Sequence, residues 1–235
     1  MRSRRYNVWI FPLIMTVIVL SVIPILQNSL ADNINPSAYP PDSKPFGLTP
    51  AQWTAKWWQW LLQIPTEINP AADKTGEHCA VGQPAKDVWF LAQTTSGPGE
   101  RTCSVPPGRT LILLPATNEC SKAENPTLTT ESALGDCAIT GNAVNSLMAS
   151  VDGVQLKNLE KYRVQSPAFT INLPKENNAG VSAGPTEAVA NAYIIFLKPL
   201  SPGNHTVKSS QVTLEDPTTN TQNFQYSIVY HLNVK

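Results

Sequence analysis

The C-terminal end of the chain carries the clearest hydrophobic pattern. Between residues 224 and 234 every second side chain is apolar, and the positions between are polar apart from Val229. Side chains alternate between two faces along a β-strand, so this pattern predicts a long antiparallel strand with one buried face. The preceding segment 200–207 predicts the turn and the penultimate strand of an immunoglobulin-like sandwich.

Shorter apolar segments recur through the middle of the chain, at residues 87–92, 109–114, 147–151, 169–173 and 192–197. Proline, glycine and asparagine separate them, which is typical of short strands joined by turns. We therefore expect a mainly β fold, an antiparallel β-sandwich of the immunoglobulin-like or jelly-roll-like type.

Residues 49–64 have the pattern of an amphipathic helix instead. Thr49 and Gln52 have the spacing of a capping box, Pro50 suits the first helical position, and Pro65 ends the segment. The sequence thus predicts a tryptophan-rich helix before the sandwich.

The function of this helix depends on its tryptophans. Trp53, Trp57 and Trp60 recur at helical spacing on one stripe, which favours a role in the core. Trp58 lies off the stripe and is the candidate ligand-binding residue, because indole rings also stack on sugars.

The N-terminus predicts the compartment. Arg2, Arg4 and Arg5 precede an apolar segment, and Ser29 and Ala31 occupy the positions that a signal peptidase reads, so residues 1–31 are interpreted as a signal peptide. The apolar segment 8–26 is also long enough for an uncleaved membrane anchor. We expect residues 32–45 to form a proline-rich linker and residues 46–235 the secreted domain.

Export places the four cysteines in an oxidising compartment, where they form disulfides. Four cysteines allow three pairings, of which we predict the sequential one, Cys79–Cys103 and Cys120–Cys137, in a loop-rich region. Each bond would stabilise the fold by about 3 kcal/mol in the chain-entropy model. No cysteine spacing typical of a zinc site occurs, and we expect no metal.

Charge and motifs exclude several classes of protein. Without residues 1–31 the chain has 14 basic and 17 acidic residues, a net charge of −3, and no basic cluster, so nucleic acid is not an expected partner. No catalytic or nucleotide-binding motif occurs among those considered, and no cofactor is expected. Asn204 begins an Asn-His-Thr sequon, which matters only where the source cell glycosylates asparagine.

Four motifs occur together in this chain: Phe46-Gly47-Leu48-Thr49, Lys56-Trp57-Trp58-Gln59-Trp60, Ser150-Val151-Asp152-Gly153 and Tyr162-Arg163-Val164-Gln165-Ser166-Pro167. In combination they resemble a family of exported bacterial and archaeal proteins with no assigned activity. The resemblance covers about residues 46–235. It implies a secreted, disulfide-bonded domain and assigns no functional residue.

Three functions remain open from the sequence. The first is a non-enzymatic extracellular protein that binds a ligand, a glycan or a cell-surface partner. The second is a polysaccharide hydrolase, which needs two carboxyl groups about 5–10 Å apart. The third is a structural envelope protein held by its N-terminal helix. The carboxylates in the cysteine-bearing half are Asp73, Glu77, Asp87, Glu100 and Glu119.

Overall fold

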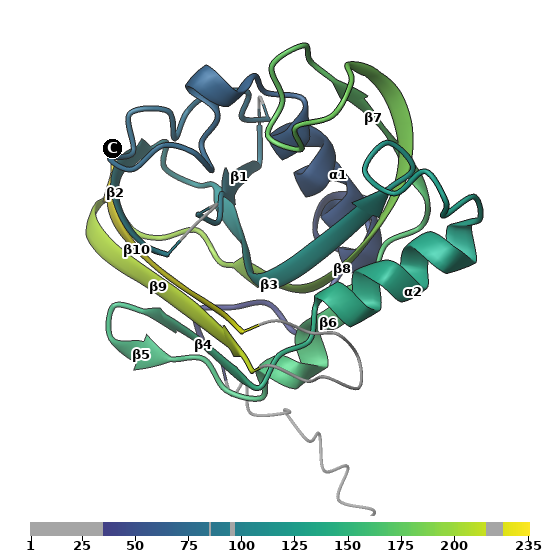
Figure 1. Cartoon of the computed structure of the whole chain (residues 1–235). Coiled ribbons are helices and arrows are strands. Elements are labelled where there is room, and N and C mark those ends of the chain that lie inside the picture. The colour runs from purple at the N-terminus through teal and green to yellow at the C-terminus, as the bar shows by residue number, and fades with distance from the viewer. Residues whose placement is uncertain (1–34, 85, 95–96, 215–222) are drawn as a thin grey trace, which may run out of the picture. The chain divides into compact units, whose positions relative to one another are not determined.

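The computed structural model describes residues 35–84, 86–94, 97–214 and 223–235 and shows a mainly β protein with two sheets (Figure 1). The predicted signal peptide, residues 1–31, and the alternative anchor, residues 8–26, lie outside the described residues. In the part of the chain that is described, no helix is long and apolar enough to span a bilayer.

Sheet A has five strands. Its order is β1 (Val88–Leu91), β3 (Thr110–Ser121), β8 (Gly184–Leu197) and β6 (Arg163–Gln165), and β7 (Phe169–Leu173) also pairs with β8. β1 runs parallel to β3, whereas β3, β6 and β7 are antiparallel to β8.

Sheet B also has five strands. Its order is β2 (Pro98–Val105), β10 (Phe224–Val234), β9 (Gly203–Thr213), β4 (Ser146–Val151) and β5 (Val154–Gln155). The expected penultimate strand is present as β9, which begins at Gly203 and pairs antiparallel with β10 along its whole length. β10 pairs parallel with β2, however.

The prediction of purely antiparallel sheets is therefore wrong, and both sheets are mixed. Alternation of apolar and polar residues reports which face of a strand is buried, but it carries no information on the direction of a neighbouring strand. Direction can be read from the sequence only where a tight turn joins two strands, as at Asp152-Gly153 between β4 and β5.

One hydrophobic cluster lies between the two sheets. Sheet A contributes alternate residues such as Trp89, Leu111 and Ile195, and sheet B contributes the apolar face of β10. Tyr226, Ile228, Tyr230, Leu232 and Val234 are all buried, which confirms the one-sided burial expected for this strand.

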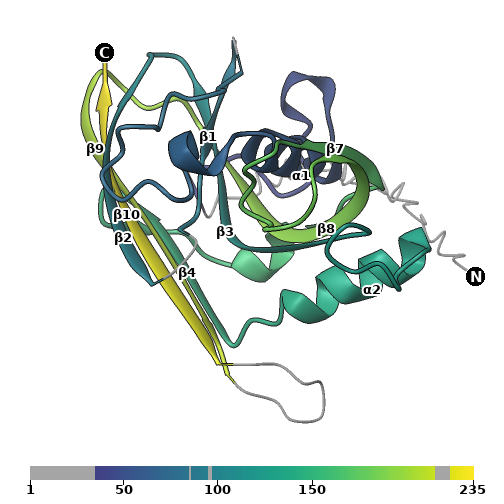
Figure 2. The same cartoon turned by 45° about the horizontal axis from the view of Figure 1, so that its top comes forward.

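The opposite face of sheet A is covered by α1 (Pro50–Leu62), as Figure 2 shows. Val88 and Phe90 of β1 face the helix, whereas Trp89 and Leu91 of the same strand face sheet B. Burial on both faces explains why residues 88–92 and 111–114 are continuously apolar instead of alternating.

The start of α1 follows from its sequence. The Thr49 side chain accepts a hydrogen bond from the Gln52 backbone N–H, and the Gln52 side chain accepts one from the Thr49 N–H. The capping box and the helix are thus confirmed. The remaining helical segments are η1 (Pro45–Gly47), η2 (Thr66–Ile68), α2 (Glu131–Gly141) and η3 (Leu159–Tyr162), where η denotes a 3₁₀-helix.

The predicted linker 32–45 is wrong for the part that the structure describes. Ala38 is fully buried and forms a bridge to Leu197 at the end of β8, and the Tyr39 N–H donates to the Phe196 carbonyl. The prolines predicted an extended segment, but turns interrupt it, with hydrogen bonds from the Ala38 N–H to the Asn35 carbonyl and from the Ser43 N–H to the Pro40 carbonyl. The backbone of the segment pairs with sheet A instead of spanning solvent.

Both predicted disulfides are confirmed. Cys79–Cys103 joins the segment before β1 to β2, and Cys120–Cys137 joins β3 to α2. The expectation of a loop-rich region holds only for the Cys79 side, because the other three cysteines lie in strands or a helix. Two disulfides are consistent with an extracytoplasmic location.

Candidate binding groove

A groove of about 430 Å³ runs between α1 and the segment that precedes β1. We call it the α1 groove. Buried aromatic and aliphatic residues form its floor, and its rim carries two glutamines and one lysine. Its lining residues are Trp53, Lys56, Gln59, Trp60, Gln63, Ile64, Gly82, Pro84 and Phe90.

The tryptophan stripe of α1 is mostly core, as the sequence predicts. Trp57 is fully buried, and Trp53 and Trp60 are 7% and 8% exposed. Each indole N–H donates to a backbone carbonyl: that of Trp53 to Pro45, at 3.0 Å, and that of Trp57 to Leu91, at 3.2 Å. These bonds fix the rings, so the edges of Trp53 and Trp60 that reach the groove are held in place.

Trp58, the residue that the sequence singles out for ligand binding, does not line this groove. Its indole N–H donates to the Thr117 hydroxyl at 2.9 Å, and its ring packs edge to face against Trp57. Trp53 and Trp60, which helical spacing assigns to the core, line the groove instead. Spacing cannot separate a ring buried in the core from one whose edge remains in a groove.

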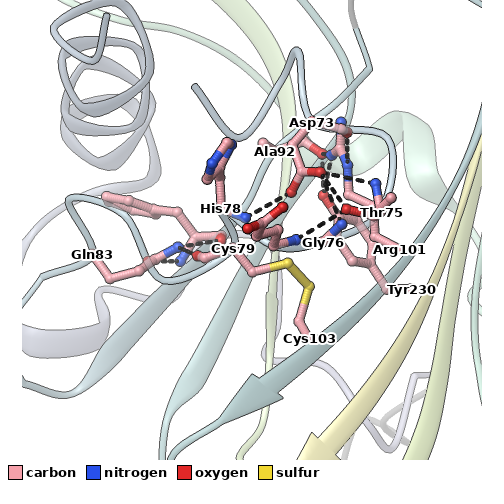
Figure 3. Close-up of a disulfide and its surroundings, with 12 residues drawn as sticks. Asp73, Thr75, Gly76, His78, Cys79, Gln83, Ala92, Arg101, Cys103 and Tyr230 are labelled. Atoms are coloured by element: carbon pink, nitrogen blue, oxygen red, sulfur yellow. Dashed lines mark hydrogen bonds between the residues drawn. A yellow bond between two sulfur atoms is a disulfide. The ribbon is translucent and has the colours of Figure 1, made fainter. Parts of the chain in front are cut away.

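The segment 79–84 forms the second wall, and one side chain attaches it to β1. The Gln83 amide donates to the Phe90 carbonyl at 2.9 Å and accepts from the Phe90 N–H at 2.8 Å (Figure 3). It also donates to the Cys79 carbonyl at 2.8 Å. Gln83 thus occupies the free edge of β1 as a short strand would.

The same wall contacts the helix. The Trp60 indole N–H donates to the Val81 carbonyl at 3.0 Å. Gly82 has a positive φ of 63°, and a Cβ there would lie 3.1 Å from Ile64 Cδ1 and 3.3 Å from Trp60 Nε1. A side chain at this position would be strained and would crowd the groove.

Arg101 anchors the segment that precedes this wall, residues 71–78, and lies next to the Cys79–Cys103 disulfide (Figure 3). It is only 1% exposed. Its guanidinium donates to the carbonyls of Asp73, Ala71 and Ala92 and, at 2.8 Å, to the Tyr230 hydroxyl. A fully hydrogen-bonded guanidinium tolerates this burial, and it connects the segment to β10.

The Asp73 carboxylate closes the same segment into a tight loop. It accepts hydrogen bonds from the backbone N–H groups of Thr75, Gly76 and His78 at 2.8–3.0 Å. Partial burial acts to raise the pKa of Asp73, but these hydrogen bonds outweigh it and leave the pKa below its usual value. Gly76 has no room for a Cβ, which would lie 2.3 Å from the Thr102 carbonyl oxygen.

The charge around the α1 groove is positive. Lys56 lies on the helix side, and Arg109 donates to the Pro84 carbonyl on the opposite wall at 3.4 Å. None of the described lining residues is acidic. The groove therefore combines an apolar floor with amide groups and the cationic side chain of Lys56.

Three of the carboxylates named for hydrolysis have partners of their own. Asp73 closes its own loop, and Glu100 pairs with His231 at 2.7 Å. Glu119 is hydrogen-bonded to Glu124. Glycosidases need carboxyls about 5–10 Å apart, and hydrogen-bonded carboxyls are closer than that.

Glu119 is nevertheless unusual. Burial, followed by the charge of Glu124 and the hydrogen bond to it, raises the pKa of Glu119 from 4.5 to about 9. Its buried Oε1 has no hydrogen-bond partner. Glu119 is thus a neutral acid at physiological pH.

This pKa predicts a pH-dependent stability. Between pH 4.5 and about 9 the folded protein keeps a proton on Glu119 that the unfolded chain releases, so the free energy of unfolding falls as pH rises. Glu119→Gln should remove this slope and stabilise the protein by about 3 kcal/mol near pH 7. Urea unfolding at pH 5, 7 and 8.5 measures both effects. The exposed Glu67→Gln is the control, and an unchanged slope in Glu119→Gln would contradict the prediction.

Ser201, His205 and Asp152 form an array that resembles a catalytic triad in composition only. His205 Nδ1 lies 2.7 Å from Asp152 Oδ2, and this hydrogen bond raises the pKa of His205. His205 Nε2 lies 2.8 Å from the Ser201 carbonyl oxygen and 3.4 Å from its hydroxyl. The His205 ring therefore donates to the Ser201 carbonyl and links the segments that hold Ser201 and Asp152. It does not activate the Ser201 hydroxyl.

The other sequence candidates are dispersed. His231 and His205 bind different carboxylates, and the described residues hold no group of three or more potential metal ligands. Asn204, the sequon residue, is exposed near the start of β9.

A second groove, of about 280 Å³, lies on the outer face of sheet B. Its lining residues are Met148, Ala149, Ser150, Gln155, Lys208, Ser209, Ser210, Ser227, Ile228 and Val229. It contains no aromatic ring. The α1 groove is larger, and its walls are fixed by a disulfide and by side-chain hydrogen bonds, so it is the stronger binding candidate.

Comparisons with known proteins do not assign the chain to a family. No family model and no curated protein matches it. The solved structure of PbICP-C in complex with falcipain-2 aligns over 64% of this chain and 100% of its own at 11% identity, with a TM-score of 0.24. The solution structure of Amebosin aligns over 59% and 96% at 11% identity, with a TM-score of 0.16. Both scores are too low to support an argument.

Proposed function

We propose that this chain is an exported, non-enzymatic binding protein whose α1 groove takes a carbohydrate. The observation that carries the proposal is the groove itself, with the edges of Trp53 and Trp60 in its floor and Gln63 on its rim. Ligand sites are typically concave and mostly apolar, with a few polar groups that orient the ligand. Sugars offer both an apolar C–H face and hydroxyl groups.

The rigidity of the groove supports binding further. The Cys79–Cys103 disulfide, the Gln83 amide and the Trp60 indole N–H all hold the wall formed by segment 79–84. A preformed site loses little conformational entropy when a ligand binds, which raises affinity.

We also propose that the two sheets constitute a β-sandwich related to the immunoglobulin-like type. The shared cluster between the sheets and the β9–β10 hairpin support it. Secretion by way of residues 1–31, and membership of the exported family that the sequence motifs resemble, belong to the same proposal; the disulfides are in keeping with it.

A groove-filling variant tests the function. Gln63 is exposed at the end of α1, so Gln63→Trp should fill the groove with little effect on folding. We expect a panel of neutral and acidic oligosaccharides to contain at least one ligand in calorimetric titrations. Gln63→Trp should weaken its binding more than tenfold.

Gln155→Trp is the matched control, because Gln155 is an exposed glutamine in the sheet B groove. This variant should bind as the parent does. If only Gln155→Trp loses binding, the ligand binds in the sheet B groove and not in the α1 groove. If no oligosaccharide in the panel binds, the proposed function is refuted.

A further inference from the structure

The charge of the α1 groove indicates which sugars it accepts. The chain without residues 1–31 has a net charge of −3, yet none of the described residues that line the groove is acidic. Lys56 lies in one wall, and Arg109 is bonded to the opposite wall at Pro84. A local excess of positive charge on an acidic protein selects anionic ligands.

Lys56 is placed to contact such a ligand directly. It occupies the position one turn after Trp53 and one turn before Trp60, and its side chain is exposed at the groove. Lys56 forms no ion pair with any other described residue. The Lys56 ammonium group can donate a charge-assisted hydrogen bond to a ligand carboxylate. The carbon atoms next to that carboxylate would then contact the aromatic rings in the groove floor.

We propose that the α1 groove binds acidic sugar chains, with Lys56 recognising the carboxylate of a uronic acid unit. This inference rests on the proposed carbohydrate-binding function. The carboxylate supplies the charge, and the C–H groups of the same ring contact the floor formed by Trp53, Trp60 and Phe90.

Two matched oligosaccharides test the inference. We expect a galacturonic acid tetramer to bind the full-length exported protein at least tenfold more tightly than the uncharged galactose tetramer. Raising the salt concentration from 50 to 500 mM should weaken binding of the acidic tetramer only, because the interaction of exposed charges is screened.

Variants assign the effect to one side chain. Lys56→Gln should lower the affinity for the acidic tetramer five- to tenfold and leave the neutral tetramer unaffected, and Lys56→Arg should restore most of the loss. Lys208→Gln, which removes the same charge from the outer face of sheet B, should have no effect.

Each contrary result has its own meaning. Equal binding of the two tetramers would overturn the preference for acidic sugars and leave the proposed function standing. Binding of neither, with no other oligosaccharide bound, would refute both. A tetraglutamate peptide that binds as tightly as the acidic tetramer would show recognition of charge alone and overturn the sugar class.

Discussion

Replacement of Trp57 by alanine is expected to lower the free energy of unfolding by about 3–5 kcal/mol, the usual cost of deleting a large buried aromatic side chain. Trp57 is fully buried between α1 and sheet A. Its ring contacts Trp58 and Trp60, and its indole N–H satisfies the Leu91 carbonyl. The variant therefore leaves a cavity and removes this hydrogen bond.

Denaturant unfolding of the purified domain measures this loss. Trp57→Phe is the control, because it retains most of the ring volume and loses only the indole donor, so it should cost clearly less than alanine. A Trp57→Ala variant as stable as the parent would contradict the interpretation of α1 as the layer that closes sheet A.

The second large effect is expected in β10. Ile228 is 1% exposed and faces the cluster between the sheets. Ile228→Lys would bury a charge without a partner, which costs several kcal/mol or prevents folding. The yield of soluble exported protein should fall to near zero.

The adjacent position provides the comparison. Ser227 faces away from the cluster, on the outer side of sheet B. Ser227→Lys should change stability by about half a kcal/mol or less. Equal tolerance at both positions would mean that β10 does not have one buried face.

The sequence predicts the elements whose patterns are local. The capping box of Thr49 and Gln52, the alternation along β10 and the nearby cysteine pairs all involve residues close in the chain, and all are confirmed. These features are decided by neighbouring residues and need no knowledge of the remaining fold.

The features missed from sequence depend on distant partners. The pairing of β2 with β10 joins residues more than one hundred positions apart. Residues 35–45 are proline-rich, and only the contact of Ala38 and Tyr39 with β8 shows that they belong to the domain. Local composition does not indicate such contacts.

The candidate groove could be predicted only in part. The sequence predicts the tryptophan-rich helix, but it singles out Trp58, which departs from the stripe and does not line the groove. The other wall rests on Gln83, whose amide pairs with β1, and no sequence signal distinguishes it from other loop glutamines. A site between a helix and a loop requires the tertiary structure.

Nuclear magnetic resonance of the indole N–H groups during titration with the galacturonic acid tetramer tests the central claim most directly. We expect the signals of Trp53 and Trp60 to shift and saturate, because both rings line the α1 groove. The signal of Trp89, which is buried between the sheets, should stay unchanged. Saturating shifts confined to residues of the sheet B groove such as Met148 and Gln155, with Trp53 and Trp60 unaffected, would contradict binding in the α1 groove.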